Sequence, residues 1–598
     1  MRKFISNMKQ LQTRNSFIVS KALKNFVFAA VLTAAAAQLA HTADSMIVGH
    51  IVGPDAVSAI NLVLPLVEVL NCMGFLICFG ANAMCAQAIG SGDKKRVAKV
   101  FSSTILTVMT LGLAVSLAIC LFSYQIVDIM SDEPRLDQMA YDYIHTYAMG
   151  GWLQMLSYGL CLFAATDGRP RMVTRAVVLG ALGNGLADVL FIWLLDMGVK
   201  GAAIGSLTMF VVNVLFLANY LRRSSSYRLA WPGKDFFSIF GHNIREGAPV
   251  TLSNSLMAVT IMLLNHIVLT YLGADGLFLW SVCLQMLLLT YVFIDGLIES
   301  LFAVGGILVG ERDLRGLQIL VRQALIIICS LVAVVIVLMY IPGLVGMLFG
   351  VTDPALSAEL DRVLRIFALM LIPFAVSQIL LNAYQLVGHQ VASAVTATLQ
   401  TVFMVVMVWV VAEVEGIELW WGFAIGCMLV LLSQLLFTFV SSRMARGEVS
   451  SLTLIPQTNK GYTFDRSVTY QPDDVYAALN EMDAFLKSTV ADHSVRFEVN
   501  LCCEELMTNL ASFTTSRVAS HSFDVHICVN DEGIYVTIKD AGRPFDPIRA
   551  GKMADANIGT KEHEHLGLRL VTNIIPDITY KYMYGQNTVF IYRKNPSV

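Results

Sequence analysis

Twelve apolar runs, each of roughly 20 residues or more, recur before residue 442, and such a run is long enough to cross about 30 Å of hydrocarbon. The chain has 598 residues, 56% of them hydrophobic and 14% charged, whereas an ordinary soluble domain is about 25% charged. We therefore expect an all-α polytopic membrane domain with twelve transmembrane helices. The expected spans cover residues 26–50, 57–82, 101–124, 138–164, 172–196, 202–221, 248–272, 278–304, 318–346, 361–385, 391–413 and 419–441.

Basic residues set the expected orientation. They precede the first run and recur after every second run, for example at Lys94 to Arg96 and at Arg222 and Arg223. Because loops rich in Lys and Arg stay on the cytoplasmic side, both termini are expected in the cytoplasm. The net charge of -3 gives no reason to expect nucleic acid as a partner. Eleven scattered cysteines match no zinc or disulfide pattern and are interpreted as small buried hydrophobes.

Three short loops repeat with one offset of 220 residues. The pairs are VGPDA at 52–56 with LGADG at 272–276, AIGSGD at 88–93 with LVGERD at 308–313, and TDGRP at 166–170 with LVGHQ at 386–390. A shared offset indicates a duplicated six-helix unit, hence two six-helix lobes. Because six is even, both lobes start on the same side of the membrane. Such repeats are typical of secondary transporters, which bind substrate and ions inside or between the halves.

Acidic residues inside the apolar runs indicate where ions bind. Asp44 lies in the first run, where an ionised carboxylate costs several kcal/mol. Gln38 and His41 share its helical face and are expected to line a cavity. In the fifth run, Asn184 and Asp188 stand at i,i+4 on one face. Paired carboxylates hold a proton, and oxygen ligands also suit a hard cation, so both H+ and Na+ remain open.

Three further acids lie inside apolar runs. Glu68 follows Pro65 in the second run, and Asp295 and Glu299 share a face in the eighth. They are expected either to line a cavity or to make hydrogen bonds between helices.

Three motifs resemble the multidrug and toxic compound extrusion (MATE) transporters. TADSMIVGHIVGPDAVSA resembles their first-helix signature, AIGSGDKKRV the loop after their second helix, and GNGLADVLFIWLLDMGVKGAAIG their fifth-helix motif. The resemblance covers about residues 15–445. It implies a two-lobe H+ or Na+ antiporter that exports small organic compounds from a prokaryotic cell, as a multi-pass protein of the inner or plasma membrane. It also implies that Asp44, Asn184 and Asp188 form the cation site of the amino lobe.

The remainder of the chain has the composition of a soluble domain of about 125 residues, a usual domain size. Helical and alternating segments predict an α/β sandwich. In EELMTN, Glu505 and Asn509 stand at i,i+4, where an amide oxygen suits Mg2+ and a carboxylate can accept a proton. Asp540 and Gly542 lie in DAGRPFDP, and Gly567 in HLGLRLV stands at a helix start that favours phosphate.

The order of these motifs resembles the GHKL (Bergerat) ATP-binding fold, in the branch of anti-sigma-factor serine kinases. The resemblance implies that Asn509 binds Mg2+, that Glu505 is the catalytic base and that Asp540 reads adenine. It further implies that Gly542 and Gly567 shape the ATP pocket, that Thr588 supports the adenine site and that residues 546–566 form a lid. His565 departs from the family, which has glycine there, and this puts efficient turnover in doubt. A histidine-kinase function and direct ATP-driven transport both fit poorly, because a phosphoacceptor module and a Walker A motif are lacking.

The resulting domain organisation has six parts. They are an N-terminal segment (1–25), an amino lobe (26–222), an inter-lobe loop (223–247), a carboxyl lobe (248–442), a linker (443–469) and the ATP-binding domain (470–595).

Three functions remain open at this point. The first is a cation-coupled exporter with a cytoplasmic ATP-binding regulatory domain. The second is a membrane sensor whose C-terminal domain acts as a serine/threonine kinase on, or sequesters, a cytoplasmic regulatory protein. The third is a lipid-linked flippase. Substrate flux that survives deletion of residues 450–598 favours the first, whereas labelling of a soluble partner from ATP favours the second.

Overall fold

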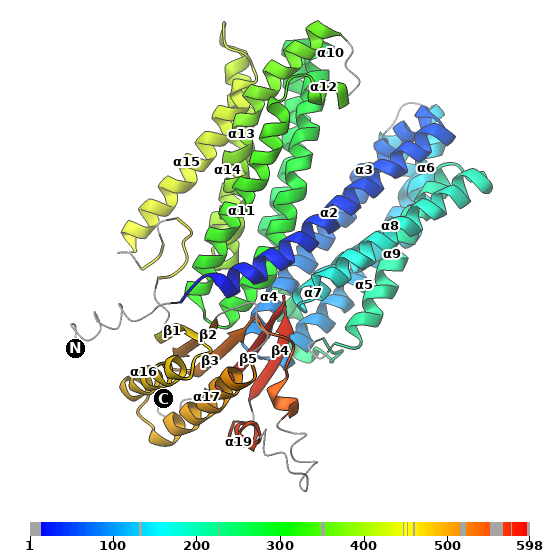
Figure 1. Ribbon diagram of the computed structural model, residues 1–598. Helices are drawn as coiled ribbons and strands as arrows, with labels where there is room; N and C mark the ends of the chain where they lie inside the picture. The colour runs from blue at the N-terminus through cyan, green and yellow to red at the C-terminus, as the bar shows by residue number, and fades with distance from the viewer. Residues whose placement is uncertain are drawn as a thin grey trace.

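The computed structural model describes residues 14–130, 134–224, 227–348, 353–445, 448–450, 452–457, 461–514, 522–550, 566–575 and 577–594. Long helices form a bundle, and a small domain of strands and helices lies at one end of it (Figure 1). We call the bundle end that contacts this domain the domain end, and the opposite one the far end.

The amino lobe is a bundle of apolar helices, two of which continue into π-helical turns. Pro54 and Pro170 stand at the first turns of α3 and α8, where their missing N–H groups leave no intrahelical bond unmade. The elements are α2 (Phe17–Ile51), α3 (Pro54–Gly74), η1 (Phe75–Phe79), α4 (Gly80–Gly90), α5 (Lys94–Met130), α6 (Pro134–Gly150), α7 (Trp152–Thr166), α8 (Pro170–Asp188), η2 (Val189–Leu194) and α9 (Val199–Leu221).

The carboxyl lobe repeats this arrangement with a longer first element. Gly273 breaks α10 into two spans, because its φ of 67° lies in the left-handed region that glycine tolerates. The elements are η3 (Gly233–Asp235), α10 (Phe236–Gly310), α11 (Leu314–Tyr340), α12 (Leu344–Leu348), α13 (Pro354–Leu386), α14 (Gln390–Ala412) and α15 (Trp421–Met444).

The predicted inter-lobe loop (223–247) is shorter in the structure, because residues 236–247 form the first turns of α10. Phe236 and Phe240 lie one turn apart and stack with 6.5 Å between their ring centroids. The helix therefore extends beyond the apolar run from which its start was predicted.

The predicted spans match the structure one for one. Within the described residues, 11 helices are long and apolar enough to cross a membrane, and the bent pair Leu136–Gly150 and Trp152–Thr166 makes 12. This pair bends by 50° at Gly151 and corresponds to the predicted span 138–164. The expectation of twelve membrane helices in two lobes is confirmed.

The lobes touch each other at the domain end through glycines that the repeat relates. A Cβ atom on Gly90 would lie 2.1 Å from the carbonyl oxygen of Ile307, and one on Gly310 would lie 2.0 Å from that of Gln87. These two contacts are equivalent under the 220-residue offset of the repeat. The lobes meet here and diverge toward the far end (Figure 1).

The C-terminal domain is an antiparallel sheet with helices on one face. The strand order is β1-β2-β3-β5-β4, and each neighbouring pair is antiparallel. Alternate side chains such as Val536 and Ile538 pack against the helices, as the predicted sandwich requires. The elements are β1 (Tyr462–Thr469), α16 (Pro472–Thr489), α17 (His493–Thr514), β2 (Ser522–Val529), β3 (Gly533–Asp540), α19 (Leu566–Ile574), β4 (Ile578–Met583) and β5 (Gln586–Lys594).

The predicted linker (443–469) ends earlier in the structure, because its last residues form strand β1. Its side chains alternate, and Phe464 and Val468 are buried in the core of the domain. Eight residues with only two buried apolar side chains are a weak strand signal, and pairing with β2 is what stabilises the strand.

The other face of the sheet lies against the membrane part. A buried ionic cluster lies between the sheet and the membrane part, around Arg14, which stands just before α2. Arg14 lies 2.6 Å from Asp313, which caps α11, and 3.0 Å from Asp524 of β2. Asp465 of β1 lies 3.4 Å from Arg14 and accepts a 2.8 Å hydrogen bond from Nδ1 of His526. The cluster joins four segments that are far apart in sequence.

His526 gives this cluster a pH dependence. Burial alone would lower the pKa of His526, but Asp465 and Asp313 outweigh burial and the repulsion from Arg14, so the net direction is upward from 6.5. A raised pKa in the folded state means that protonated His526 stabilises the protein at low pH. This contribution is lost as the pH rises through the folded-state pKa.

We therefore expect the melting temperature of the full-length protein in detergent to fall as the pH is raised above 6.5, and His526→Gln to lose this part of the pH profile. The exposed His493 on α17 supplies the matched control, because His493→Gln leaves the cluster intact. An unchanged pH profile in His526→Gln contradicts the role of the cluster.

Candidate functional sites

Asp188 and Asn184 form a buried polar pair at the end of α8. Asp188 is 0% exposed and Asn184 is 5% exposed. The Asn184 amide donates a 2.9 Å hydrogen bond to Oδ2 of Asp188, across one helical turn. The π-helical turn η2 follows directly, and such turns are frequent at functional sites.

Asp44 reaches this pair from α2, the helix packed beside α8. The two helices are tied together by a 2.8 Å hydrogen bond between the hydroxyl groups of Thr33 and Thr174. The carboxyl groups of Asp44 and Asp188 lie within hydrogen-bonding reach of each other. The structure therefore brings together Asp44, Asn184 and Asp188, the three residues selected from the sequence.

Gly205 of α9 leaves the space for this group. A Cβ atom on Gly205 would lie 1.8 Å from Oδ1 of Asp188 and 3.5 Å from Oδ1 of Asn184. Tyr143 of α6 is buried nearby and makes a hydrogen bond with Ser206, the next residue of α9. Four helices thus surround the acid pair.

The remaining predicted cavity residues belong to α2, α3 and α10. Gln38 is on an exposed part of α2, and the side chain of His41 lies outside the described residues. Glu68 of α3 is exposed and accepts a 3.3 Å hydrogen bond from Asn71. Asp295 and Glu299 belong to α10, in the other lobe, and lie near Tyr158 of α7.

In the C-terminal domain, α17 and α19 are in close contact beside the predicted phosphate site. Glu505 and Asn509 are half-buried on one face of α17. A Cβ atom on Gly567 would lie 1.7 Å from Oε2 of Glu505, so a larger residue here would displace the Glu505 carboxylate. His565 and residues 551–565 of the predicted lid lie outside the described residues.

Asp540 stands at the end of β3 within a hydrogen-bond network. Its Oδ1 accepts hydrogen bonds from the Gly542 N–H (2.7 Å) and from the Asn587 amide (3.1 Å). Burial raises the pKa of Asp540, and these two hydrogen bonds oppose that rise. The Asn587 oxygen in turn accepts 2.7 Å and 3.1 Å hydrogen bonds from the Tyr580 hydroxyl and the Phe545 N–H. The Asn587 amide also donates a 2.9 Å hydrogen bond to the carbonyl of Arg543, so all of its polar atoms are bonded within the domain and it holds the Asp540 carboxylate in place.

Comparison with known families matches both parts. The MatE family model matches residues 29–190, and the histidine kinase-like ATPase domain matches residues 468–593. The membrane part belongs to the MATE family of multidrug efflux transporters. The C-terminal part of this MATE protein is a histidine kinase-like ATPase domain.

Similar proteins cover the MATE part. The multidrug export protein MepA of Staphylococcus aureus (strain MRSA252) is 24% identical over 404 residues, which are 66% of this chain and 87% of MepA. MepA of Staphylococcus saprophyticus is 22% identical over the same shares. A crystal structure of MATE in complex with MaD5 has a TM-score of 0.65 at 22% identity, covering 72% of this chain and 96% of that one. An outward-facing MATE family transporter has a TM-score of 0.65 at 21% identity, covering 73% and 98%.

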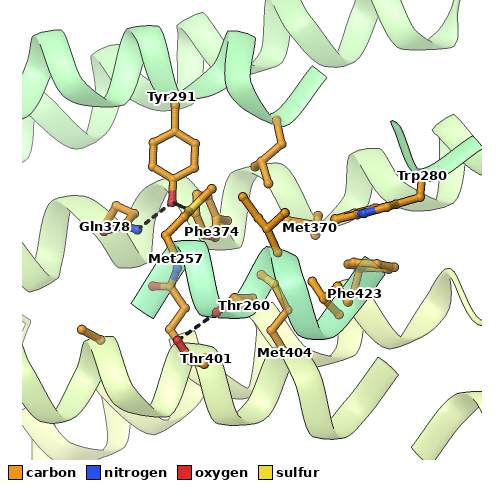
Figure 2. Close-up of a pocket in the computed structure, with 15 residues that line it drawn as sticks. Met257, Thr260, Trp280, Tyr291, Met370, Phe374, Gln378, Thr401, Met404 and Phe423 are labelled. Atoms are coloured by element: carbon orange, nitrogen blue, oxygen red, sulfur yellow. Dashed lines mark hydrogen bonds between the residues drawn. The ribbon is translucent and has the colours of Figure 1, made fainter. Parts of the chain in front are cut away.

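The carboxyl lobe of this MATE protein holds a small cavity of about 30 Å³ among α10, α13, α14 and α15 (Figure 2). Aromatic and thioether side chains such as Trp280, Phe374 and Met404 surround it. Its polar groups include Thr260, which donates a 3.0 Å hydrogen bond to Thr401. This volume suits a water molecule and is too small for an organic substrate. Sequence reasoning missed it, because its residues look like ordinary core residues of apolar runs.

The structure places Thr588 on the face of the sheet opposite to the predicted adenine site. Successive residues of a strand point to opposite faces, and Asn587 shares the face of Asp540. Thr588 instead lines a cavity against the membrane part, together with Gly92 and Lys94. Thr588 was assigned from a motif match alone, and such a match does not decide the face of the sheet to which a strand residue points.

We expect Asn587→Ala to weaken Mg-ATP binding by roughly five- to tenfold, because Asp540 loses the hydrogen bond that positions its carboxylate and a net hydrogen bond is worth about 1 kcal/mol. Thr588→Val, on the opposite face, is the matched control and should leave the affinity unchanged. Calorimetric titration of the full-length protein in detergent measures both. An equal or larger loss of Mg-ATP affinity in Thr588→Val would show that Thr588, and not the face of Asn587, supports the adenine site.

Proposed function

We propose that this chain is a cation-coupled exporter of small organic compounds with a cytoplasmic ATP-binding regulatory domain. The observation that carries the proposal is the contact between Asp44 and Asp188, from two different helices, within the membrane part. The similarity to proteins named multidrug export proteins supports organic compounds as the substrate class.

The chemistry of the acid pair favours a cation as the coupling species. Two carboxylates can share a hydrogen bond only if a proton lies between them, and each raises the affinity of the other for that proton. The carboxylate oxygens and the Asn184 oxygen are also hard ligands, so Na+ is the alternative occupant. Asp188 is fully buried and Asp44 half-buried, which gives an ion a path from the side of Asp44.

Cation exchange at this site supplies a mechanism. With one monovalent cation bound, the acid pair carries a single negative charge that the two carboxyl groups share, and α2 can pack against α8. Release leaves two negative charges in a low-dielectric region, and their repulsion favours separation of α2 from α8. The lobe thus has two packings, and the cation concentration on each side selects between them.

The orientation follows from the basic loops. Lys94 and Lys95 begin α5 at the domain end, and Arg312 lies in the equivalent loop of the carboxyl lobe. The positive-inside rule then assigns the domain end to the cytoplasm of a cell in whose plasma or inner membrane the chain lies. ATP is available there, which agrees with the place of the ATPase domain.

In the pocket of that domain, we infer that Asn509 binds Mg2+ and that Asp540 reads adenine, with Asn587 holding the Asp540 carboxylate in position. The bound Mg2+ would neutralise phosphate charge. Gly542 and Gly567 allow backbone and helix to approach the nucleotide closely.

A second function uses the same pocket. Glu505 lies on α17 beside the first turn of α19, and both helices lie on the side of the sheet away from the membrane part (Figure 1). A carboxylate in that place can accept the hydroxyl proton of a serine or threonine on a cytoplasmic regulatory protein. Labelling of a soluble protein from ATP, lost in Glu505→Gln, tests this function.

For the transporter, we expect Asp44→Asn to abolish cation-coupled efflux from loaded proteoliposomes, because an amide neither releases a proton nor carries a charge. The control is Asp196→Asn, the same chemical change at an exposed turn with φ of 50°, which asparagine adopts readily. Efflux that persists at the wild-type rate in Asp44→Asn would remove the acid pair from the mechanism.

For the pocket, Asn509→Ala should lower the affinity for Mg-ATP and leave the affinity for ATP in EDTA almost unchanged, because only the metal ligand is lost. Calorimetry with and without EDTA separates the two. A loss of equal size under both conditions, or no loss, contradicts the assignment of Asn509 to Mg2+.

A further inference from the structure

The C-terminal domain holds the amino lobe by the loop between α7 and α8. Lys581 of β4 lies 2.9 Å from Asp167, and both side chains are largely buried. The β4–β5 turn enters the membrane part, where the Tyr584 hydroxyl donates a 3.2 Å hydrogen bond to the carbonyl of Thr166. Gly168 has φ of 91° and lies so close to the domain that an added Cβ would be 2.5 Å from Met583.

The same sheet holds the carboxyl lobe by the loop between α10 and α11. Lys539 of β3 pairs with Glu311, and both side chains are buried. Arg14 links Asp313, two residues further, to Asp524 of β2. Each of these pairs places opposite charges out of water, so removal of one partner leaves an unpaired buried charge and strongly weakens the contact.

The two anchors flank a residue beside the place where the lobes touch, because Lys539 and Lys581 both pair with Thr588 across the sheet and Thr588 lines a cavity with Gly90. Gly90 and Gly310, equivalent in the two lobes, are packed on each other there. Figure 1 shows the sheet across this end of the bundle, with the lobes diverging away from it. A domain held by both lobes at this place opposes any movement that separates their cytoplasmic ends.

The anchors and the nucleotide site use the same strands. On β3, Lys539 faces the membrane part and the next residue, Asp540, faces the pocket. In the same way, the side chain of Gln586 donates a hydrogen bond to the carbonyl of Ile18, and the next residue, Asn587, faces the pocket. Lys21 of α2 also donates a 3.1 Å hydrogen bond to the carbonyl of Ala541. A change at the nucleotide site therefore acts on residues adjacent to the anchors.

We propose that the C-terminal domain is an internal clamp that holds the two lobes together at their cytoplasmic ends and thereby restrains transport. The restraint on transport rests on the proposed exporter function, whereas the restraint on the lobes does not. If the domain holds the lobes together, the loss of either anchor should let the lobes separate. If one anchor alone were enough to keep the lobes together, they would separate only when both anchors are lost.

The experiment measures the distance between the lobes in full-length protein in nanodiscs. Spin labels on encoded unnatural amino acids replace the exposed residues Lys95 of α5 and Gln318 of α11, and pulsed EPR records their separation. Lys581→Asp places like charges together at Asp167 in the amino-lobe anchor, and Lys539→Glu does the same at Glu311 in the carboxyl-lobe anchor. Lys487→Glu, which breaks an exposed pair with Asp483 inside the domain, is the control.

Each single variant should add a population with a longer separation, and the double variant should add no more than either one. The control should match the wild type, and the charge swap Lys539→Glu with Glu311→Lys should restore the short separation. Unchanged distances in both single variants, or an effect only in the double variant, overturn the clamp.

Transport in proteoliposomes is measured on the same proteins. The single variants should export an organic cation faster by roughly two- to tenfold, as a partial shift of a two-state equilibrium gives. If the separation increases but no protein, including the wild type, moves any substrate, the exporter function fails while the clamp stands. If the separation increases and export does not, the domain does not restrain transport.

Discussion

The buried carboxyl group of Asp188 is the constraint on which the membrane part depends. An ionised acid within a bilayer costs several kcal/mol, so it must be neutralised, paired or exposed to water. Here its partners are a second acid, Asp44, and an amide, Asn184, and no basic side chain of the described residues is paired with it in the structure. Glycine at position 205 gives the acid the space it occupies. Under the proposed function, a cation bound between the two acids offsets this cost, and its release favours a different packing of the helices.

A second constraint acts at the junction. A soluble ATPase domain would leave one face of its sheet in water. Here that face carries Lys539 and Lys581, which pair with acids of the membrane part, and the acids of β1 and β2 that pair with Arg14. Buried charges of this kind contribute specificity of position more reliably than stability, because their desolvation offsets most of the attraction. The domain is therefore docked in one orientation, with its nucleotide face turned away from the membrane part (Figure 1).

The sequence predicted what depends on local pattern, and not what depends on distant contacts. Apolar length was enough for the twelve spans, and i,i+4 spacing was enough for Asn184 and Asp188. The start of α10 at Phe236 and the strand β1 were missed, because pairing and packing extend those elements beyond their local signals. Thr588 was assigned from a motif match, which does not decide the face of the sheet to which a strand residue points. The Arg14 cluster could not be predicted, since its members come from four distant segments.

The most direct test of cation coupling uses wild-type proteoliposomes without ATP. A proton or sodium gradient is imposed, and export of a fluorescent organic cation is followed before and after an ionophore collapses that gradient. Export that follows one of the two gradients and stops with the ionophore is the predicted result. Export that ignores both gradients and begins only when Mg-ATP is added would contradict the account.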